Sequence, residues 1–179
     1  MAMAAKEPKA EVRVVGKING LTAYDVFYRF QSEGAIDWKS ILVRQGPNSY
    51  REIYHDEPNE GKPNPSFLVK VGEETVLGVE DNKYRMDGVT EFWCFGAEGP
   101  QQLDFKPVWK AAREAIPADQ FIVERPGGGL PNLVVSLPTL LRGSAPPCCE
   151  IRGVVKVSFR MQQCRLIVVG TEFQAGNHQ

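Results

Sequence analysis

The sequence predicts an α+β protein in which a curved or barrel-like antiparallel β-sheet dominates and one amphipathic helix packs against it. Most segments alternate apolar and polar residues with a period of two, as half-buried strands do. Short turns rich in Gly, Pro and Asn separate these segments. One stretch, Asp104–Ile116, changes to the spacing of a helix. We expect residues 1–10 to be a frayed terminus, residues 11–173 to form one β-rich domain, and residues 174–179 to form a tail.

The first two strands are expected at Glu11–Val15 and Leu21–Phe30, because Asn19–Gly20 between them is a strong hairpin turn signal. In the second strand, Tyr24 and its apolar neighbours at every second position alternate with Asp25 and Arg29. This pattern predicts a half-buried strand, and Phe27 breaks it, so part of the strand is expected to be covered on both faces.

A second hairpin is expected around Gly46–Pro47–Asn48–Ser49, because so short a connection allows only antiparallel pairing. The other expected strands are rich in β-forming residues. The strands after the first two are expected at Ile36–Gln45, Tyr50–His55, Ser66–Val71, Thr75–Glu80, Val89–Phe95, Gln120–Glu124 and Leu133–Leu137.

The helix is predicted from apolar residues spaced three and four apart. Asp104 precedes it as a capping residue, Pro107 is tolerated in its first turn, and Pro117 ends it. The apolar stripe consists of Phe105, Val108, Trp109, Ala112 and Ile116.

The chain is expected to end in a β-hairpin over Ile151–Phe173 with its turn at Met161–Gln163. One strand places Ile151, Val155, Val157 and Phe159 on one face. An isolated hairpin is marginal in water, so this face is expected to lie against the core.

Composition excludes several classes of function. The 179 residues carry 21 basic and 22 acidic side chains, a net charge of -1, so no nucleic-acid partner is expected. No apolar run approaches the roughly 20 residues of a membrane-spanning helix. Two localisations are open: cytoplasmic, or exported with a signal peptide that has been removed.

The four cysteines are Cys94, Cys148, Cys149 and Cys164. Their spacing lacks the two-residue gap of common zinc sites, and adjacent cysteines rarely bond each other. Reduced structural thiols and at least one disulfide are both open; no metal site is expected.

No residue is predicted to be catalytic, and no cofactor is expected. His55 lies beside acidic residues, but one sequence shows no converging partners, so we interpret it as a strand-end histidine. The serines, Ser40 among them, lack the glycine-flanked turn that exposes a nucleophile. The glycines after Pro126 are followed by no helix signal of a phosphate-binding loop.

Aromatic residues are the most informative group, because on a curved sheet they either line a cavity for an apolar ligand or fill the core. The candidate ligand-binding residues are Tyr24, Tyr28, Trp38, Tyr50, Tyr54 and Trp93. We therefore expect a soluble, non-enzymatic binding or interaction domain whose partner is a small apolar ligand or a protein. The alternatives are an enzyme with a carboxylate and tyrosine site, and a structural subunit of a larger assembly.

Overall fold

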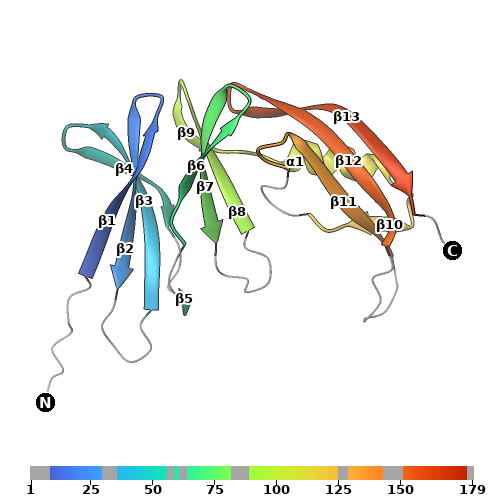
Figure 1. The fold of residues 1–179 in the computed structure, drawn as a ribbon, viewed down its shortest axis with the longest axis horizontal. Helices are drawn as coiled ribbons and strands as arrows, with labels where there is room; N and C mark the ends of the chain where they lie inside the picture. Colours follow the sequence, from blue (N-terminus) through green and yellow to red (C-terminus); the bar gives the residue numbers. More distant parts are fainter. Residues whose placement is uncertain are drawn as a thin grey trace, which may run out of the picture. The chain divides into compact units, whose positions relative to one another are not determined.

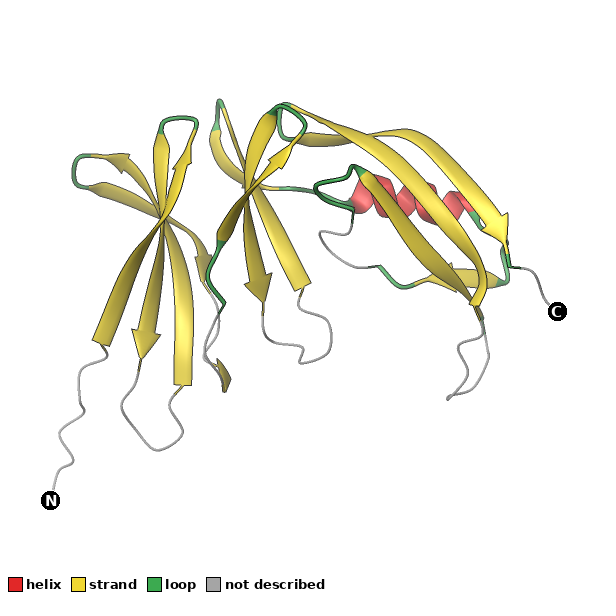
Figure 2. Cartoon of the chain, in the orientation of Figure 1, coloured by secondary structure: helices red, strands yellow, loops and turns green. Residues whose placement is uncertain are grey.

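The computed structural model describes residues 9–29, 36–55, 59–60, 64–81, 89–124, 129–142 and 151–176. Strands make up most of these residues and pair antiparallel, and the described part of the chain contains one helix (Figures 1 and 2). The predicted α+β class is therefore confirmed. The described helix is too short and too polar to cross a membrane.

The chain forms two compact units. The first combines Met1–Val69 with Thr75–Pro100, and the second combines Lys70–Glu74 with Gln101–Gln179. The unit boundary falls within the β-rich region, and each unit is described below by itself.

The first unit contains a five-stranded sheet with the order β1-β2-β3-β4, in which β5 also pairs with β3. Asn19 and Gly20 adopt positive φ angles in the β1–β2 turn, as the sequence predicts. A two-residue turn at Pro47–Asn48 joins β3 to β4. The strands are β1 (Lys9–Ile18), β2 (Leu21–Arg29), β3 (Ile36–Gly46), β4 (Ser49–His55) and β5 (Asn59–Glu60).

A second, four-stranded sheet follows with the order β6-β7-β8-β9. Its strands are β6 (Phe67–Val71), β7 (Glu74–Asp81), β8 (Val89–Gly96) and β9 (Gly99–Gln102). β9 and the short β5 are absent from the sequence prediction, because the Gly–Pro start of β9 and the proline-rich surroundings of β5 resemble loops.

Within the first unit, residues of the five-stranded sheet and of β7 and β8 form one hydrophobic core. The five-stranded sheet supplies Ile18, Ala23, Ile41 and Val43, and β7 and β8 supply Leu77, Val79 and Phe95. The side-chain amide of Asn19 donates a hydrogen bond to the carbonyl of Phe95 at 2.5 Å. The turn residue that shapes the first hairpin therefore also ties this hairpin to β8.

The second unit packs α1 (Lys106–Ala115) against a sheet with the order β10-β11-β12-β13. The strands are β10 (Gln120–Ile122), β11 (Val134–Leu141), β12 (Ile151–Gln162) and β13 (Arg165–Ala175). Val108, Trp109 and Ala112 are buried, which confirms the predicted apolar stripe. The helix N-cap is Phe105, which has no side-chain capping hydrogen bond, so Asp104 is not the N-cap that the sequence predicts. The carboxylate of Asp104 accepts a hydrogen bond from the amide of Lys106 at 2.9 Å.

The terminal hairpin is present as β12 and β13. Val155, Val157 and Phe159 are buried on one face, as expected. The prediction for Ile151 is wrong: its side chain is 56% exposed, because it begins the strand before the alternation reaches the core. The turn also lies later than predicted, with positive φ angles at Gln163 and Cys164.

Candidate functional site

The register of the five-stranded sheet divides its side chains between two faces. Residues directly opposite each other in antiparallel strands share a face. Tyr24 lies opposite Val14 on β1 and opposite Leu42 on β3, while Ala23 lies opposite Val43 in the core. We call the face that carries Tyr24, and that points away from this core, the outer face. By register, the outer face carries Val12, Val14, Tyr24, Val26, Tyr28, Trp38, Ser40, Leu42, Arg44, Tyr50, Glu52 and His55.

Aromatic and β-branched side chains form the apolar part of the outer face. The rings of Tyr24 and Tyr50 pack edge to face with their centroids 5.9 Å apart. Tyr50 is 51% exposed, and Val12 and Val14 on β1 are 63% and 60% exposed. Apolar surface is therefore presented to solvent by β1 and β4, and the half-buried Tyr24 of β2 contacts Tyr50.

Two more of the sequence-predicted ligand residues have outer-face positions. Tyr28 lies opposite Trp38 in the β2–β3 register. The side chain of Trp38 is outside the described part of the structure, so its position is known from the backbone alone. Four of the six aromatic candidates thus share one face of one sheet.

The other two aromatic candidates contact the hydrophobic core of the first unit. Tyr54 and Trp93 are partly buried and pack against the core cluster of the first unit. The Lys39 ammonium lies 5.8 Å from the centroid of the Tyr54 ring. The six candidates therefore do not line a single surface; burial separates Tyr54 and Trp93 from the rest.

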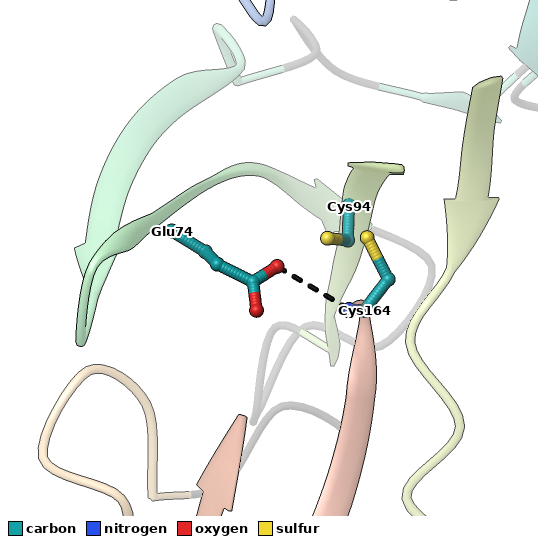
Figure 3. A group of neighbouring side chains, drawn as sticks. All are labelled: Glu74, Cys94 and Cys164. Atoms are coloured by element: carbon teal, nitrogen blue, oxygen red, sulfur yellow. Dashed lines mark hydrogen bonds between the residues drawn. The ribbon is translucent and has the colours of Figure 1, made fainter. Parts of the chain in front are cut away.

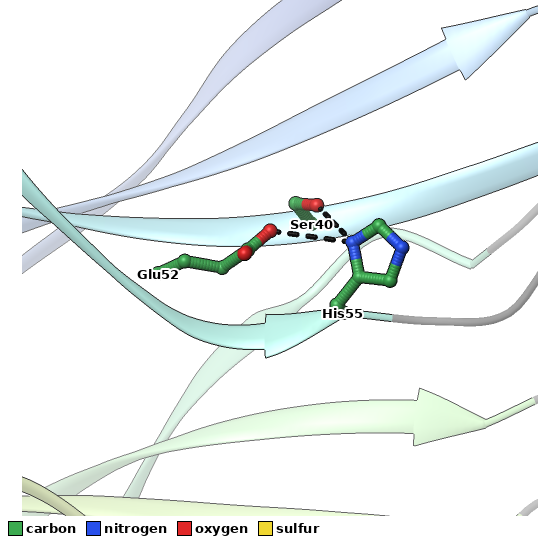
Figure 4. A network of polar contacts seen from close by, with 3 residues as sticks. All are labelled: Ser40, Glu52 and His55. Carbon is green, nitrogen blue, oxygen red and sulfur yellow. Dashed lines mark hydrogen bonds and ion pairs between the residues drawn. The ribbon is translucent and has the colours of Figure 1, made fainter.

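A polar contact between three residues lies on the outer face (Figure 4). The Oγ atom of Ser40 lies 2.8 Å from Nδ1 of His55, and Oε1 of Glu52 lies 3.3 Å from the same nitrogen. Ser40 is buried, whereas the side chains of His55 and Glu52 are about half exposed. The sheet register brings Ser40 and His55 together, since they lie directly opposite each other on β3 and β4.

This arrangement differs from the serine–histidine–carboxylate geometry of hydrolases. In those enzymes the two partners occupy different ring nitrogens, so that the imidazole accepts the serine proton on one side and is oriented from the other. Here both partners contact Nδ1, and the hydroxyl of Ser40 is only 1% exposed. The contact is suited to fixing the position of the imidazole rather than to activating the serine.

The core side of the same sheet contains two charged residues, one on β2 and one on β3. Asp25 and Lys39 are both fully buried. The carboxylate of Asp25 accepts a hydrogen bond from the backbone amide of Ser66 at 2.9 Å, and its Oδ1 has no hydrogen-bond partner within the described ranges. Asp25 and its neighbour Val26 are both buried, so β2 is covered on both faces at this point, as the break in its alternation at Phe27 indicates. A buried acceptor of this kind is stabilised by its amide donor, which comes from 41 residues further along the chain.

The ammonium of Lys39 has its own buried partners. It donates to the carbonyl of Asn64 at 2.7 Å and to Oγ of Ser66 at 3.4 Å. Ser66 therefore contacts both charged residues, and it anchors the segment before β6 against the five-stranded sheet. No sequence signal marks these partners, because the contacts join segments far apart in the chain.

Replacing Lys39 with methionine should destabilise the protein by about 1–3 kcal/mol. Methionine fills much of the same volume, but it leaves the acceptors on Asn64 and Ser66 without their charged donor. Urea unfolding would measure the loss, with Lys70→Met at an exposed position as the control. Equal stability of the Lys39→Met variant and the wild type would show that these hydrogen bonds contribute nothing net.

For two of the four cysteines, the structure decides between a reduced thiol and a disulfide. Cys94 and Cys164 are both disulfide-bonded, and Cys148 and Cys149 lie outside the described residues. The backbone amide of Cys164 donates to Oε2 of Glu74 at 3.3 Å (Figure 3). A disulfide sulfur is not a thiolate, so neither described cysteine offers a nucleophile or a metal ligand in this state.

The second unit contains a cavity of about 330 Å³ beside the start of α1. Its lining is both polar and apolar and contains none of the six aromatic candidates; it consists of Gln101, Gln102, Asp104, Pro107, Cys164, Arg165 and Leu166. The cavity therefore does not correspond to the apolar pocket that the sequence suggests.

Comparison with protein-family models, with curated proteins and with solved structures finds no match for this chain.

Proposed function

We propose that this chain is a non-enzymatic interaction domain, and that its outer face binds an apolar surface of a protein partner. The observation that carries the proposal is the exposed apolar surface on β1 and β4, together with the contact between Tyr50 and the half-buried Tyr24. Tyrosine is enriched at protein interfaces because its ring buries a large apolar area while its hydroxyl stays hydrated or bonded.

The openness of the patch favours a protein over a small ligand. Small ligands bind in concave sites that bury most of their surface. The side chains of Val12, Val14 and Tyr50 are instead more than half exposed on a sheet face. An apolar patch of this kind, rimmed by polar groups, is typical of a surface that a protein partner covers.

The polar contact described above supplies such a rim. Glu52 and His55 follow Tyr50 on the outer face of β4 and are half exposed, so they are available for hydrogen bonds to a partner. Ser40 holds the imidazole in place from below. An enzymatic role for this contact has less support, because both partners share one ring nitrogen and the serine is buried.

A random peptide library displayed on phage provides the probe for this proposal. Peptides are selected on the wild-type chain, and the binding of the most enriched synthetic peptide is measured by calorimetry. We expect aromatic and aliphatic residues in the selected peptide. The double variant Tyr24→Ser/Tyr50→Ser should weaken its binding at least about tenfold, because buried aromatic residues dominate interface energies.

The control is a double variant at exposed apolar positions of the second unit, Val123→Ser/Val134→Ser, which should bind the peptide as the wild type does. Thermal melts of both double variants verify that they are folded. Undiminished binding to the Tyr24→Ser/Tyr50→Ser variant would place the binding surface elsewhere. Saturable one-to-one binding of anilinonaphthalene sulfonate that competes with the peptide would instead identify the site as one for a small apolar ligand.

A further inference from the structure

We infer that β1 is a self-complementary edge through which two copies of this chain associate by antiparallel strand pairing. This inference concerns the edge of the five-stranded sheet and goes beyond the function proposed for its outer face. The partner is a second copy of the chain, joined by a two-fold axis through the β1 strands.

The first step is that β1 lies at the end of its sheet. Within the described part of the chain, β1 pairs with β2 alone (Figure 1). Alternate residues of an end strand direct their backbone N–H and C=O groups away from the sheet, and these groups can pair with another strand. β1 is ten residues long, and the first six of these residues are all exposed.

The second step is that only a few registers are compatible with the strand. Opposite residues must share a face, so a two-fold axis passes through a residue position, and outer-face residues pair with outer-face residues. The bulge between Val14 and Gly16 ends the regular stretch. The strand begins at Lys9, so an axis at Ala10 would pair only Lys9–Glu11 of each copy. Central positions at Glu11, Val12 and Arg13 are therefore the ones to compare.

The charges of β1 favour one of these three registers. An axis at Glu11 places the two Glu11 carboxylates opposite each other, and an axis at Arg13 does the same with the two guanidinium groups. An axis at Val12 places Glu11 of each copy opposite Arg13 of the other, twice, on one face. On the other face it pairs Val12 with Val12 and Ala10 with Val14.

This register also accounts for the exposed valines. Val12 and Val14 are 63% and 60% exposed on an edge strand, where charged side chains usually prevent association. In the Val12-centred register the charges of β1 become complementary instead of repulsive, and both valines gain a cross-strand neighbour. Strand addition obtains its affinity from backbone hydrogen bonds, and the side-chain pairs set its register.

Charge reversal tests the register directly, because Glu11 and Arg13 are exposed and their substitution leaves the core intact. Sedimentation equilibrium of the wild-type chain should show a monomer–dimer equilibrium. The single variants Glu11→Arg and Arg13→Glu should each raise the dissociation constant at least about tenfold, since each replaces two attractive pairs with two repulsive ones.

Two combinations should restore association. The double variant Glu11→Arg/Arg13→Glu recovers opposite charges in every pair and should dimerise like the wild type. An equal mixture of the two single variants should form heterodimers, because one chain then carries two basic residues and the other two acidic residues at these positions. A wild-type chain that remains monomeric at millimolar concentration would overturn the inference, as would single variants that dimerise unchanged.

A second measurement fixes the position of the axis. Under mild oxidation Val12→Cys should form an intermolecular disulfide, because Val12 faces itself across the axis. Ala10→Cys should not, because Ala10 faces Val14. Efficient cross-linking of Ala10→Cys in place of Val12→Cys would contradict the register. Neither result depends on whether the outer face binds the selected peptide, so the two proposals fail separately.

Discussion

Replacing Trp109 with alanine should lower the free energy of unfolding of the second unit by about 3–5 kcal/mol. Trp109 is 5% exposed in the middle of α1, and its ring stacks on Phe105 with the centroids 5.9 Å apart. Phe105 in turn packs edge to face with Phe159 of β12 at 6.4 Å. The indole is therefore part of the aromatic contact that joins the helix to its sheet, and its removal leaves a cavity.

Urea unfolding monitored by far-ultraviolet circular dichroism would measure this loss. Lys110→Ala, at the adjacent exposed position of the helix, is the matched control and should change stability by less than about 0.5 kcal/mol. Trp109→Phe should fall between the two. An unfolding midpoint for Trp109→Ala close to that of the wild type would mean that the stripe does not face the sheet.

Deleting residues 151–179 should prevent the second unit from folding. The deletion removes β12 and β13, which are the two strands that α1 contacts most. It thereby leaves β11 without the strand that pairs with it on one side. It also removes Val155, Val157 and Phe159 from the buried core. What remains of the unit is one helix with β10 and β11, too little to bury its apolar faces.

Hydrogen exchange detects this outcome locally. In the truncated chain, the amides of α1 should exchange as fast as those of an unfolded peptide, whereas in the full chain they should be protected. Removing only residues 177–179, which lie beyond the last described strand, serves as the control. A truncated chain that keeps α1 protected and melts cooperatively would show that the hairpin is an appendage.

Local sequence signals are sufficient for the elements that local geometry determines. The helix is recognised because its stripe repeats every three to four residues and Pro117 ends it. The two hairpins of the five-stranded sheet are recognised because Asn19–Gly20 and Pro47–Asn48 suit tight turns. In each case the deciding residues lie within a few positions of one another.

Strand β2 shows that the alternation of residues does not predict which face of a strand is buried. Alternation alone places Tyr24 inside and Asp25 outside, whereas the structure places Asp25 in the core and Tyr24 on the outer face. Period two identifies two faces but not which of them is buried. Here the choice depends on Ser66, which supplies a buried amide donor from a distant segment.

The contact between Ser40 and His55 can be predicted from the sequence once the turn is placed. Counting outward from the pair Gly46 and Ser49 beside the turn brings Ser40 opposite His55. The two register shifts in this hairpin cancel, so the count is correct at its far end. The position of the turn predicts this pair, whereas no local sequence motif around Ser40 or His55 does.

Tyrosine nitration with and without the selected peptide tests most directly whether the outer face is the binding surface. In the free chain Tyr50 should react faster than Tyr54, because Tyr50 is 51% exposed and Tyr54 packs against the core. Saturating peptide should protect Tyr24 and Tyr50 and leave the slow reaction of Tyr54 unchanged, as peptide mass spectrometry would measure. Unchanged nitration of Tyr24 and Tyr50 in the presence of bound peptide would contradict the account.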